Sequence, residues 1–321
     1  MNTKTIVSLS LAVFMIGGAQ LYGQSMAKPA AKQQRQTTLG QIVQDSSAVP
    51  MGKINHTSWN QLLGKYVDEA GDVNYKDWQA SQQDSQALNA YIDQLSSASV
   101  TKAAAREDQM AFWINAYNAV TVKGILQEYP TTSIRNHTSE TGGYNIWKNL
   151  LLNVGGRQVS LEAIEHQVLR PMGDARVHFA LVCASKGCPR LLNEAYVGKT
   201  LNEQMDRNAR HFFSIAQNFQ HDQRNRGFKL STIMKWYGGD FGADQGTQLR
   251  SISKFLPTKE AQAAANSNAV SISYLDYSWK LNEQAPKMKK VMKAGSGSKQ
   301  MGGSTKKQGS GMKKAGGSGN R

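Results

Sequence analysis

Apolar residues in the central part of the chain recur at helical spacing in several separate stretches. In residues 56–68, Trp59, Leu62, Leu63 and Tyr66 fall on one side of a helix, as expected for a surface helix that faces a core. The longest stretch should end before Pro130, because proline cannot continue a helix. Helices are therefore predicted in residues 56–68, 88–95, 108–129, 160–170 and 193–219.

Shorter stretches are rich in the β-branched and aromatic residues that favour strands. Two such runs flank Gly155 and Gly156 in "WKNLLLNVGGRQVSL", which predicts a β-hairpin. Further strands are predicted in residues 176–183, 227–231 and 271–277. Because helices and strands do not alternate regularly, the predicted fold class is α+β, a single domain with a small, largely antiparallel sheet covered by several helices.

The N-terminal residues indicate export. Lys4 precedes an apolar run in residues 6–19, and small or polar residues follow up to Gly23. This order is typical of a secretory signal peptide, and the run is shorter than a membrane span requires. We expect residues 1–23 to be a signal peptide and the mature protein to be periplasmic or extracellular, with no transmembrane span.

Removal of this segment is a testable consequence. The mature N-terminus is expected at about Ala19–Gly23, because the small residues lie there, after the apolar run. N-terminal sequencing of the exported protein checks this, and an intact Met1 in a cytosolic fraction would contradict it.

Composition divides the rest of the chain. Residues 24–52 are predicted as a low-order linker, residues 53–284 as the folded domain, and residues 285–321 as a disordered basic tail rich in Gly, Ser and Lys. The net charge of +15 is concentrated in the tail, with nine lysines, one arginine and no acidic residue, whereas 28 basic residues face 23 acidic ones before it. The body therefore gives no indication of specific nucleic-acid binding. The tail would either hold an anionic envelope polymer or another extracellular polyanion, or only increase solubility.

Deleting residues 285–321 should leave the fold intact and weaken retention on heparin. The tail carries ten positive charges and no hydrophobic anchor, so binding should fall steeply as salt increases. Heparin chromatography of the full and truncated chains measures this. Equal retention of the two chains would rule out the tail as a polyanion-binding segment.

The segment "RVHFALVCASKGCPRL" contains the most informative chemistry. His178, Cys183 and Cys188 lie five residues apart in it. If residues 176–183 form a strand, alternation places Cys183 on a buried apolar face and turns His178 the other way. Cys188 would then lie in a loop, where Lys186 and Arg190 would lower the pKa of its thiol.

The residues leave three chemistries open. An exported protein favours a disulfide between its only two cysteines. A catalytic thiol would need Cys188 to be free, with an imidazole brought near it by folding. A zinc site would lack an obvious fourth ligand. Neither a metal nor a cofactor is predicted.

Two further stretches place polar residues among apolar ones. Asn115 and Asn118 interrupt the apolar helix "AFWINAYNAVTV", and buried amides need hydrogen-bond partners. They therefore indicate either a structural network or the wall of a polar pocket. In "SLEAIEHQVLR", Glu165 lies at the edge of the apolar face, where it could be a half-buried acid facing a site.

Together these stretches resemble the family catalogued as domain of unknown function 547. The matching pieces are "LLGKYVDEAGDVNY", "AFWINAYNAVTV", "SLEAIEHQVLR", "RVHFALVCASKGCP", "STIMKWYGGDFG" and "YSWKLN". The residues that the resemblance places at the family's fixed positions are Asn115, Asn118, Glu165, His166, Arg170, His178, Cys183, Cys188 and Asn282. Ser278 stands where the family ending has an acidic residue, and Asp276 is the nearest acid that could replace it.

We expect a polar pocket lined by His178, Asn115, Asn118 and the Cys188 loop. As an enzyme, the protein would be a thiol-dependent hydrolase or acyl transferase acting on a small molecule or peptide. Cys188 would be the nucleophile and His178 the base, with either asparagine orienting the imidazole or stabilising an oxyanion, and Glu165 completing the candidate catalytic set. The alternative is a non-catalytic ligand-binding or envelope-associated module, in which a disulfide between the two cysteines clips the loop.

Overall fold

The computed structural model of the chain describes residues 35–139 and 143–285. The predicted signal peptide, and the predicted tail beyond its first residue, lie outside the described residues. The described residues up to Gln284 form one compact unit. None of the helices described in it is long and apolar enough to cross a membrane.

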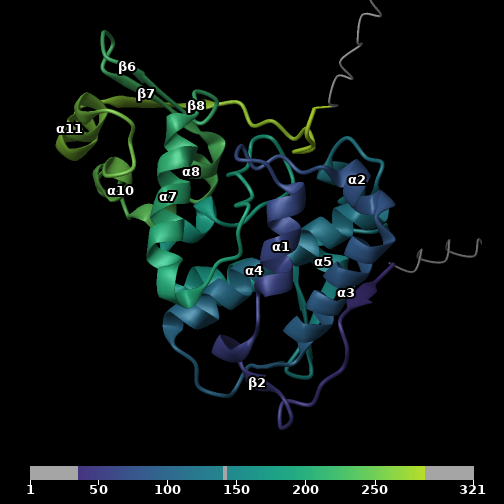
Figure 1. The fold of residues 1–321 in the computed structure, drawn as a ribbon. Coiled ribbons are helices and arrows are strands. Elements are labelled where there is room, and N and C mark those ends of the chain that lie inside the picture. The colour runs from purple at the N-terminus through teal and green to yellow at the C-terminus, as the bar shows by residue number, and fades with distance from the viewer. Residues whose placement is uncertain (1–34, 140–142, 286–321) are drawn as a thin grey trace, which may run out of the picture. The chain divides into compact units, whose positions relative to one another are not determined.

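Helices and small sheets together build this unit, which confirms the α+β class (Figure 1). The α-helices are α1 (Thr57–Tyr66), α2 (Tyr75–Ala80), α3 (Gln82–Ser96), α4 (Arg106–Glu128), α5 (Ile146–Asn149), α6 (Leu161–Ala163), α7 (Leu201–Ser214), α8 (Thr232–Trp236), α9 (Gly238–Phe241), α10 (Gln245–Ser253) and α11 (Lys259–Ser267). The strands are β1 (Thr37–Leu39), β2 (Val49–Pro50), β3 (Ala98–Ser99), β4 (Leu150–Val154), β5 (Arg157–Ser160), β6 (Phe219–Asp222), β7 (Gly227–Ser231) and β8 (Ser271–Leu275).

The described strands form three small sheets, in the orders β1-β4-β5, β2-β3 and β6-β7-β8. The hairpins β4–β5 and β6–β7 are antiparallel, whereas β1–β4, β2–β3 and β7–β8 are parallel pairs. Two of the three described sheets are therefore mixed, and a single, largely antiparallel sheet is not what forms. Hairpin partners are neighbours in sequence, but each parallel partner comes from a distant segment that local alternation cannot identify.

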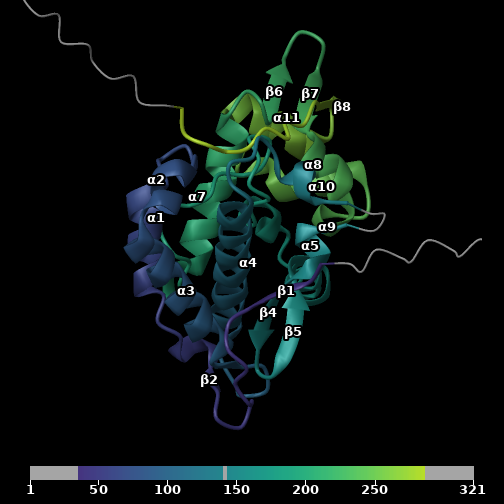
Figure 2. The same ribbon diagram turned by 90° about the vertical axis from the view of Figure 1, so that its right-hand side faces the viewer.

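Helix α4 is the central element of the unit, and its side chains from Met110 to Leu126 are nearly all buried. Figure 2 shows α1, α2 and α3 along one side of it. Its first turn carries Glu107 and Asp108, which favour the positive end of the helix dipole. The predicted helix at 108–129 is thus confirmed, within two residues at its start and one at its end.

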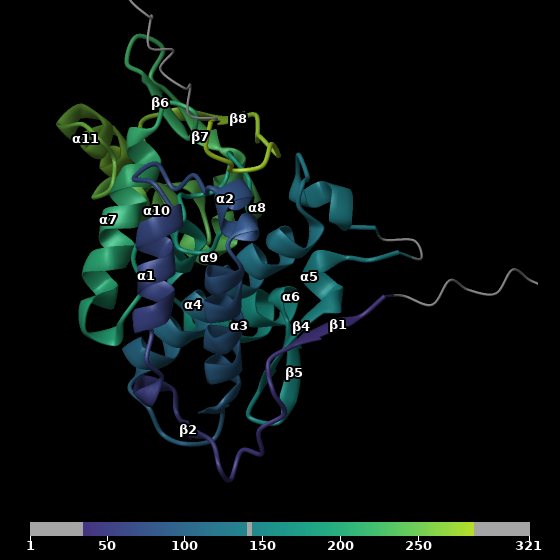
Figure 3. The same ribbon diagram turned by 45° about the vertical axis from the view of Figure 1, so that its right-hand side comes forward.

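Buried apolar side chains form two clusters. The first surrounds α4 and includes α1, α3 and β4. The second joins α7, α10, α11 and the β6-β7-β8 sheet, and its aromatic members include Phe179, Phe212 and Phe213. Figure 3 shows β6, β7 and β8 at the opposite end of the described unit from β2. The boundary between the two clusters is where the cleft described below lies.

The described part of the predicted linker is more ordered than expected. Strand β1 pairs with β4, β2 pairs with β3, and residues Met51–Lys53 form a 3₁₀ turn, η1. Leu39 and Met51 are buried in the first core. The segment is ordered because it adds strands to sheet edges, where its backbone groups find partners that its composition does not reveal.

The predicted strand at 176–183 is wrong. Residues Ala175–Phe179 form a 3₁₀ turn, η5, and the chain then continues without a regular element. The Asp174 carboxylate accepts from the Arg176 backbone N–H at 3.1 Å and from its guanidinium at 2.7 Å, which favours a turn. Val177, His178 and Phe179 are all buried, and a continuous buried run does not distinguish a strand from a helix.

Two predicted helices also differ. The one at 160–170 consists of α6, a π-helical turn η3 (Ile164–Leu169) and a 3₁₀ turn η4 (Arg170–Met172). The one at 193–219 is shorter, because α7 covers only Leu201–Ser214 and residues before it are held by side-chain amides.

Candidate functional site

A cleft of about 390 Å³ opens where the two hydrophobic cores meet. Trp147, Trp279 and Cys188 line it and pack against the first core, while Tyr237 and Tyr277 line it and pack against the second. Its walls are therefore supplied by segments far apart in sequence. A concave, mostly apolar site with a few polar groups has the properties of a ligand-binding site.

Aromatic side chains form one continuous wall of the cleft. The ring centroids of Tyr277 and Trp279 lie 4.5 Å apart, those of Trp236 and Tyr277 4.9 Å, and those of Trp147 and Trp279 6.2 Å. Trp236 is 48% exposed. The four rings thus offer an accessible surface for stacking.

Of the two glutamates that line the cleft, Glu165 is the more buried. The π turn η3 places Ile164 and Leu169, five residues apart, in the core, so that Glu165 is presented to the cleft. Only 13% of its side chain is exposed, and Tyr117 Oη donates to Glu165 Oε2 at 3.2 Å. Burial, together with the nearby Glu165 carboxylate, raises the pKa of both Tyr117 and Tyr237. Both phenols therefore remain protonated and can donate hydrogen bonds.

His178 belongs to a second polar cluster beside the cleft. Its Nε2 lies 2.7 Å from Asp240 Oδ2, and Arg170 donates to both Asp240 carboxylate oxygens at 2.6 and 2.8 Å. Arg170 holds the pKa of Asp240 at about 2, and burial lowers the pKa of His178. A neutral His178 must donate through Nε2, since the Asp240 carboxylate only accepts. The Tyr237 ring stacks on the imidazole at 4.0 Å and fixes its plane.

Cys183 and Cys188 are joined by a disulfide, with their Cα atoms 6.3 Å apart. Both residues are half-buried and both line the cleft. The sequence predicted a buried Cys183 and an exposed Cys188. This difference was wrong, because the prediction rested on a strand that does not form. Of the three chemistries left open by the sequence, the structure contains the disulfide.

Backbone pairing holds the disulfide loop against residues 277–282. Lys186 N–H donates to Lys280 O and Gly187 N–H to Ser278 O, both at 2.8 Å. A Cβ on Gly187 would lie 2.8 Å from Ser278 N, so only glycine permits this approach. Ala184 adopts φ +52° between Cys183 and Ser185, a conformation uncommon for a residue other than glycine.

Asn115 and Asn118 do not line the cleft, which corrects the predicted pocket. Asn115 exchanges two hydrogen bonds with the backbone of Tyr196, at 2.7 and 2.9 Å. Asn118 donates to Ala180 O and accepts from Val182 N–H, both at 3.0 Å. Each amide thus pairs with the backbone as a neighbouring strand would. These residues position the chain around the cleft and have no direct contact with it.

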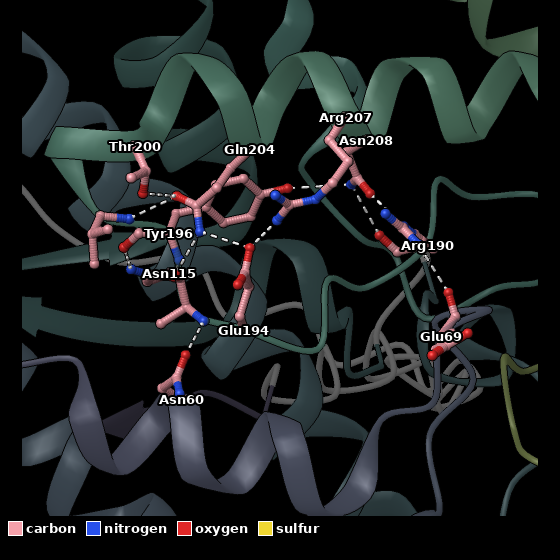
Figure 4. Close-up of polar contacts among 12 residues, drawn as sticks. Asn60, Glu69, Asn115, Arg190, Glu194, Tyr196, Thr200, Gln204, Arg207 and Asn208 are labelled. Carbon is pink, nitrogen blue, oxygen red and sulfur yellow. Dashed lines mark hydrogen bonds and ion pairs between the residues drawn. The ribbon is translucent and has the colours of Figure 1, made fainter.

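Two more amides extend this arrangement along residues 190–200 (Figure 4). Gln204 donates to Ala195 O at 2.8 Å and accepts from Val197 N–H at 3.0 Å. Asn208 donates to Phe179 O at 2.6 Å and accepts from Arg190 Nε at 2.7 Å. The amides from α4 and α7 therefore satisfy buried backbone groups on both sides of the disulfide loop.

The remaining predicted residues divide between the cleft and other places. His178, Glu165, His166 and both cysteines line the cleft. Asn282 is buried elsewhere, where it accepts from Tyr75 Oη at 2.9 Å and donates to Gly71 O at 3.2 Å. Asp276 is not among the lining residues, and the carboxylate that pairs with the site histidine is Asp240.

Sequence reasoning assigned no role to Asp240 or to the aromatic wall. Asp240 lies in "WYGGDFG", where a lone acid among glycines and aromatics could have indicated a site. Trp236, Tyr277 and Trp279 are aromatic residues in polar surroundings near the ends of helices and strands. This signal is weak, because single aromatic residues at surfaces are common.

The comparison with known families covers part of the chain that forms the cleft. Residues 101–213 match the family model described as "Protein of unknown function, DUF547", so this part of the chain belongs to that family. It contains α4, the π turn with Glu165, His178, and the disulfide loop, whereas Asp240 and the aromatic residues from Trp236 to Trp279 lie beyond the match. No curated protein and no solved structure matched the chain. The described residues contain no group of three or more His, Cys, Asp or Glu side chains arranged to hold a metal ion.

Replacing Asn118 with alanine should destabilise the unit strongly. The change leaves the buried Ala180 carbonyl and Val182 N–H without partners, and each buried unsatisfied group costs about 1–3 kcal/mol. We expect a loss of about 3 kcal/mol in the free energy of unfolding, measured by urea titration. Asn89→Ala, at an exposed position on α3, is the control and should change stability by less than about 0.5 kcal/mol. Similar losses in both variants would contradict the backbone-clamp role.

Proposed function

We propose that the domain is a ligand-binding module whose cleft takes a small molecule or a peptide side chain with a positively charged group beside an apolar surface. The observation that carries this proposal is Glu165. Its carboxylate lines the cleft, and within the described residues its one ion-pair partner is His166, with Nε2 at 3.9 Å. Among the nearby cations, Arg170 is engaged by Asp240, and Lys148, which lines the cleft, pairs with Glu162 at 3.9 Å.

The remaining lining supports the same ligand class. A cation over an aromatic face gains about 0.5–2 kcal/mol, depending on its desolvation, and the wall formed by Trp147, Trp236, Tyr277 and Trp279 supplies such faces. A hydrogen bond from an ammonium group to a carboxylate adds about 1.5–3 kcal/mol. An acid in a cleft lined by aromatic rings therefore selects amines and guanidines over anions of the same size.

A thiol-dependent hydrolase or acyl transferase is the second candidate. The observation in its favour is that Asp240 orients His178 through Nε2, which leaves Nδ1 as the basic nitrogen, as a catalytic histidine requires. In a reduced protein, Cys188 would be the nucleophile and His178 the base. This activity needs the disulfide to be opened, whereas ligand binding does not.

We also propose that the protein works outside the cytoplasm, in a periplasmic or extracellular location, with its basic tail on an anionic envelope polymer. The disulfide supports the location, because such bonds persist in oxidising compartments.

Binding of phenethylammonium, compared with that of 3-phenylpropionate, tests the ligand class. The two probes share an apolar ring and differ in charge, so Glu165 should favour the first. We expect the cation to quench tryptophan fluorescence at lower concentration than the anion, and Glu165→Gln to weaken its binding about tenfold, the effect of losing one charge-assisted hydrogen bond.

Glu162→Gln is the matched control, because Glu162 also lines the cleft but is 48% exposed and paired with Lys148 at 3.9 Å. It should change the dissociation constant less than twofold, as expected for an exposed ion pair. Equal binding of cation and anion, or equal effects of the two substitutions, would overturn the proposal. Binding by the untreated, disulfide-bonded protein separates the module from the thiol enzyme, which would act only after reduction.

A further inference from the structure

The disulfide lies at the surface of the cleft, with hydroxyl and backbone N–H groups close to its sulfur atoms. Both cysteines line the cleft, whereas a purely structural disulfide is best protected when apolar side chains cover it. The loop that carries it keeps its own backbone hydrogen bonds to Lys280 and Ser278. The geometry of the loop therefore has support that is independent of the S–S bond.

Hydrogen-bond donors are directed at the sulfur atoms. Tyr277 Oη lies 3.0 Å from Cys183 Sγ and 3.1 Å from Cys188 Sγ. The Cys183 backbone N–H points at Cys188 Sγ at 3.0 Å, and Ser185 Oγ lies 2.8 Å from Tyr277 Oη. A disulfide sulfur is a weak acceptor, but a thiolate is a strong one. The same donors would therefore act most strongly on a reduced, ionised Cys188.

We propose that Cys183–Cys188 is a redox-active disulfide that exchanges with thiols entering the cleft. The ligand class is a small-molecule or peptide thiol. This inference uses the donors around the sulfur atoms and does not depend on the charge preference proposed above.

The exchange proceeds in two balanced steps. An incoming thiolate attacks Cys183 Sγ, a bond forms between the two sulfurs, and the Cys183–Cys188 bond breaks with its electron pair leaving on Cys188. A second thiolate then attacks the incoming sulfur of this mixed disulfide and expels Cys183. Two thiols are thereby oxidised to one disulfide, the protein gains two electrons, and two protons complete its two thiols. Glutathione disulfide, or another low-molecular-weight disulfide, reverses the sequence.

The direction of attack follows from the donors. Tyr277 Oη reaches both sulfurs, and Ser185 Oγ lies 3.4 Å from Cys183 Sγ, but only Cys188 Sγ also faces a backbone N–H, that of Cys183. Cys188 is therefore the better leaving group, because exchange is faster when the leaving thiolate is stabilised. Burial raises the pKa of Tyr277, so its hydroxyl keeps the proton that it donates. The Cys183 N–H belongs to the backbone and stays in place in any side-chain variant.

Incubation of the native full chain with reduced glutathione is the first test. Alkylation and intact-mass measurement should show two thiols appearing while circular dichroism still reports the folded state, and glutathione disulfide should restore the bond. Thiols that appear only together with unfolding would overturn the proposal and leave a structural disulfide.

Tyr277→Phe is the second test, since it removes the hydroxyl and keeps the ring in the aromatic wall. Glutathione should open the disulfide about three- to tenfold more slowly, the effect expected when a leaving thiolate loses one charge-assisted hydrogen bond. Tyr274→Phe is the matched control, because Tyr274 lies on β8, is 43% exposed and does not line the cleft; it should leave the rate unchanged. Equal rates for the Tyr277 variant and the native chain would overturn the role given to the hydroxyl.

The single-cysteine variants test the order of the two sulfurs. In Cys183→Ser, the remaining Cys188 should react with iodoacetamide at lower pH than Cys183 does in Cys188→Ser, because its thiolate receives the fixed backbone N–H. The opposite order would contradict the assignment of Cys188 as the leaving group. None of these experiments uses a cationic probe. A negative result for thiol exchange can therefore be told apart from a negative result for the proposed binding of cations.

Discussion

Burying an irregular stretch of backbone is the constraint on which this structure depends. Residues 180–200 cross the interior with almost no regular secondary structure, so their N–H and C=O groups cannot satisfy one another as those of a helix or sheet do. Side-chain amides take the place of a neighbouring strand. Asn115 and Asn118 come from α4, and Gln204 and Asn208 come from α7. The helices that build the two cores therefore also fix the path of the loop between them.

This arrangement accounts for the position of the cleft. The cleft lies where the two apolar cores meet along this irregular segment, and residues of both cores line it. The disulfide loop closes one side of it and residues 277–279 lie against that loop through backbone pairing. The π turn η3 supplies a third part of the cleft wall. Its wider turn brings Glu165 to the cleft while the apolar residues that flank it stay buried.

Charge in and around the cleft is distributed unequally. Arg170 and Asp240 neutralise each other through two hydrogen bonds, and His178 joins them as a neutral, oriented imidazole. Glu165 instead receives a neutral phenol from Tyr117, which stabilises a carboxylate without cancelling its charge. The cleft thus combines a negative group with aromatic surfaces and a disulfide that faces polar donors, two features that can act on different ligands.

The sequence by itself determined the features that are local. The periodicity of "AFWINAYNAVTV" predicted α4, the glycine pair predicted the β4–β5 hairpin, and the resemblance of several short stretches identified the family that residues 101–213 match. It also recognised that Asn115 and Asn118 needed partners, without deciding which.

Tertiary structure decided the rest, because each remaining question concerned pairs of residues far apart in the chain. The buried run at 176–183 fits a strand or a 3₁₀ turn equally well until Asp206 and Asp174 bind Arg176. Asp240 pairs with a histidine 62 residues away, and Tyr277 meets Cys188 across 89 residues. Local pattern carries no information about such contacts, since they arise only when the two cores close on the loop between them.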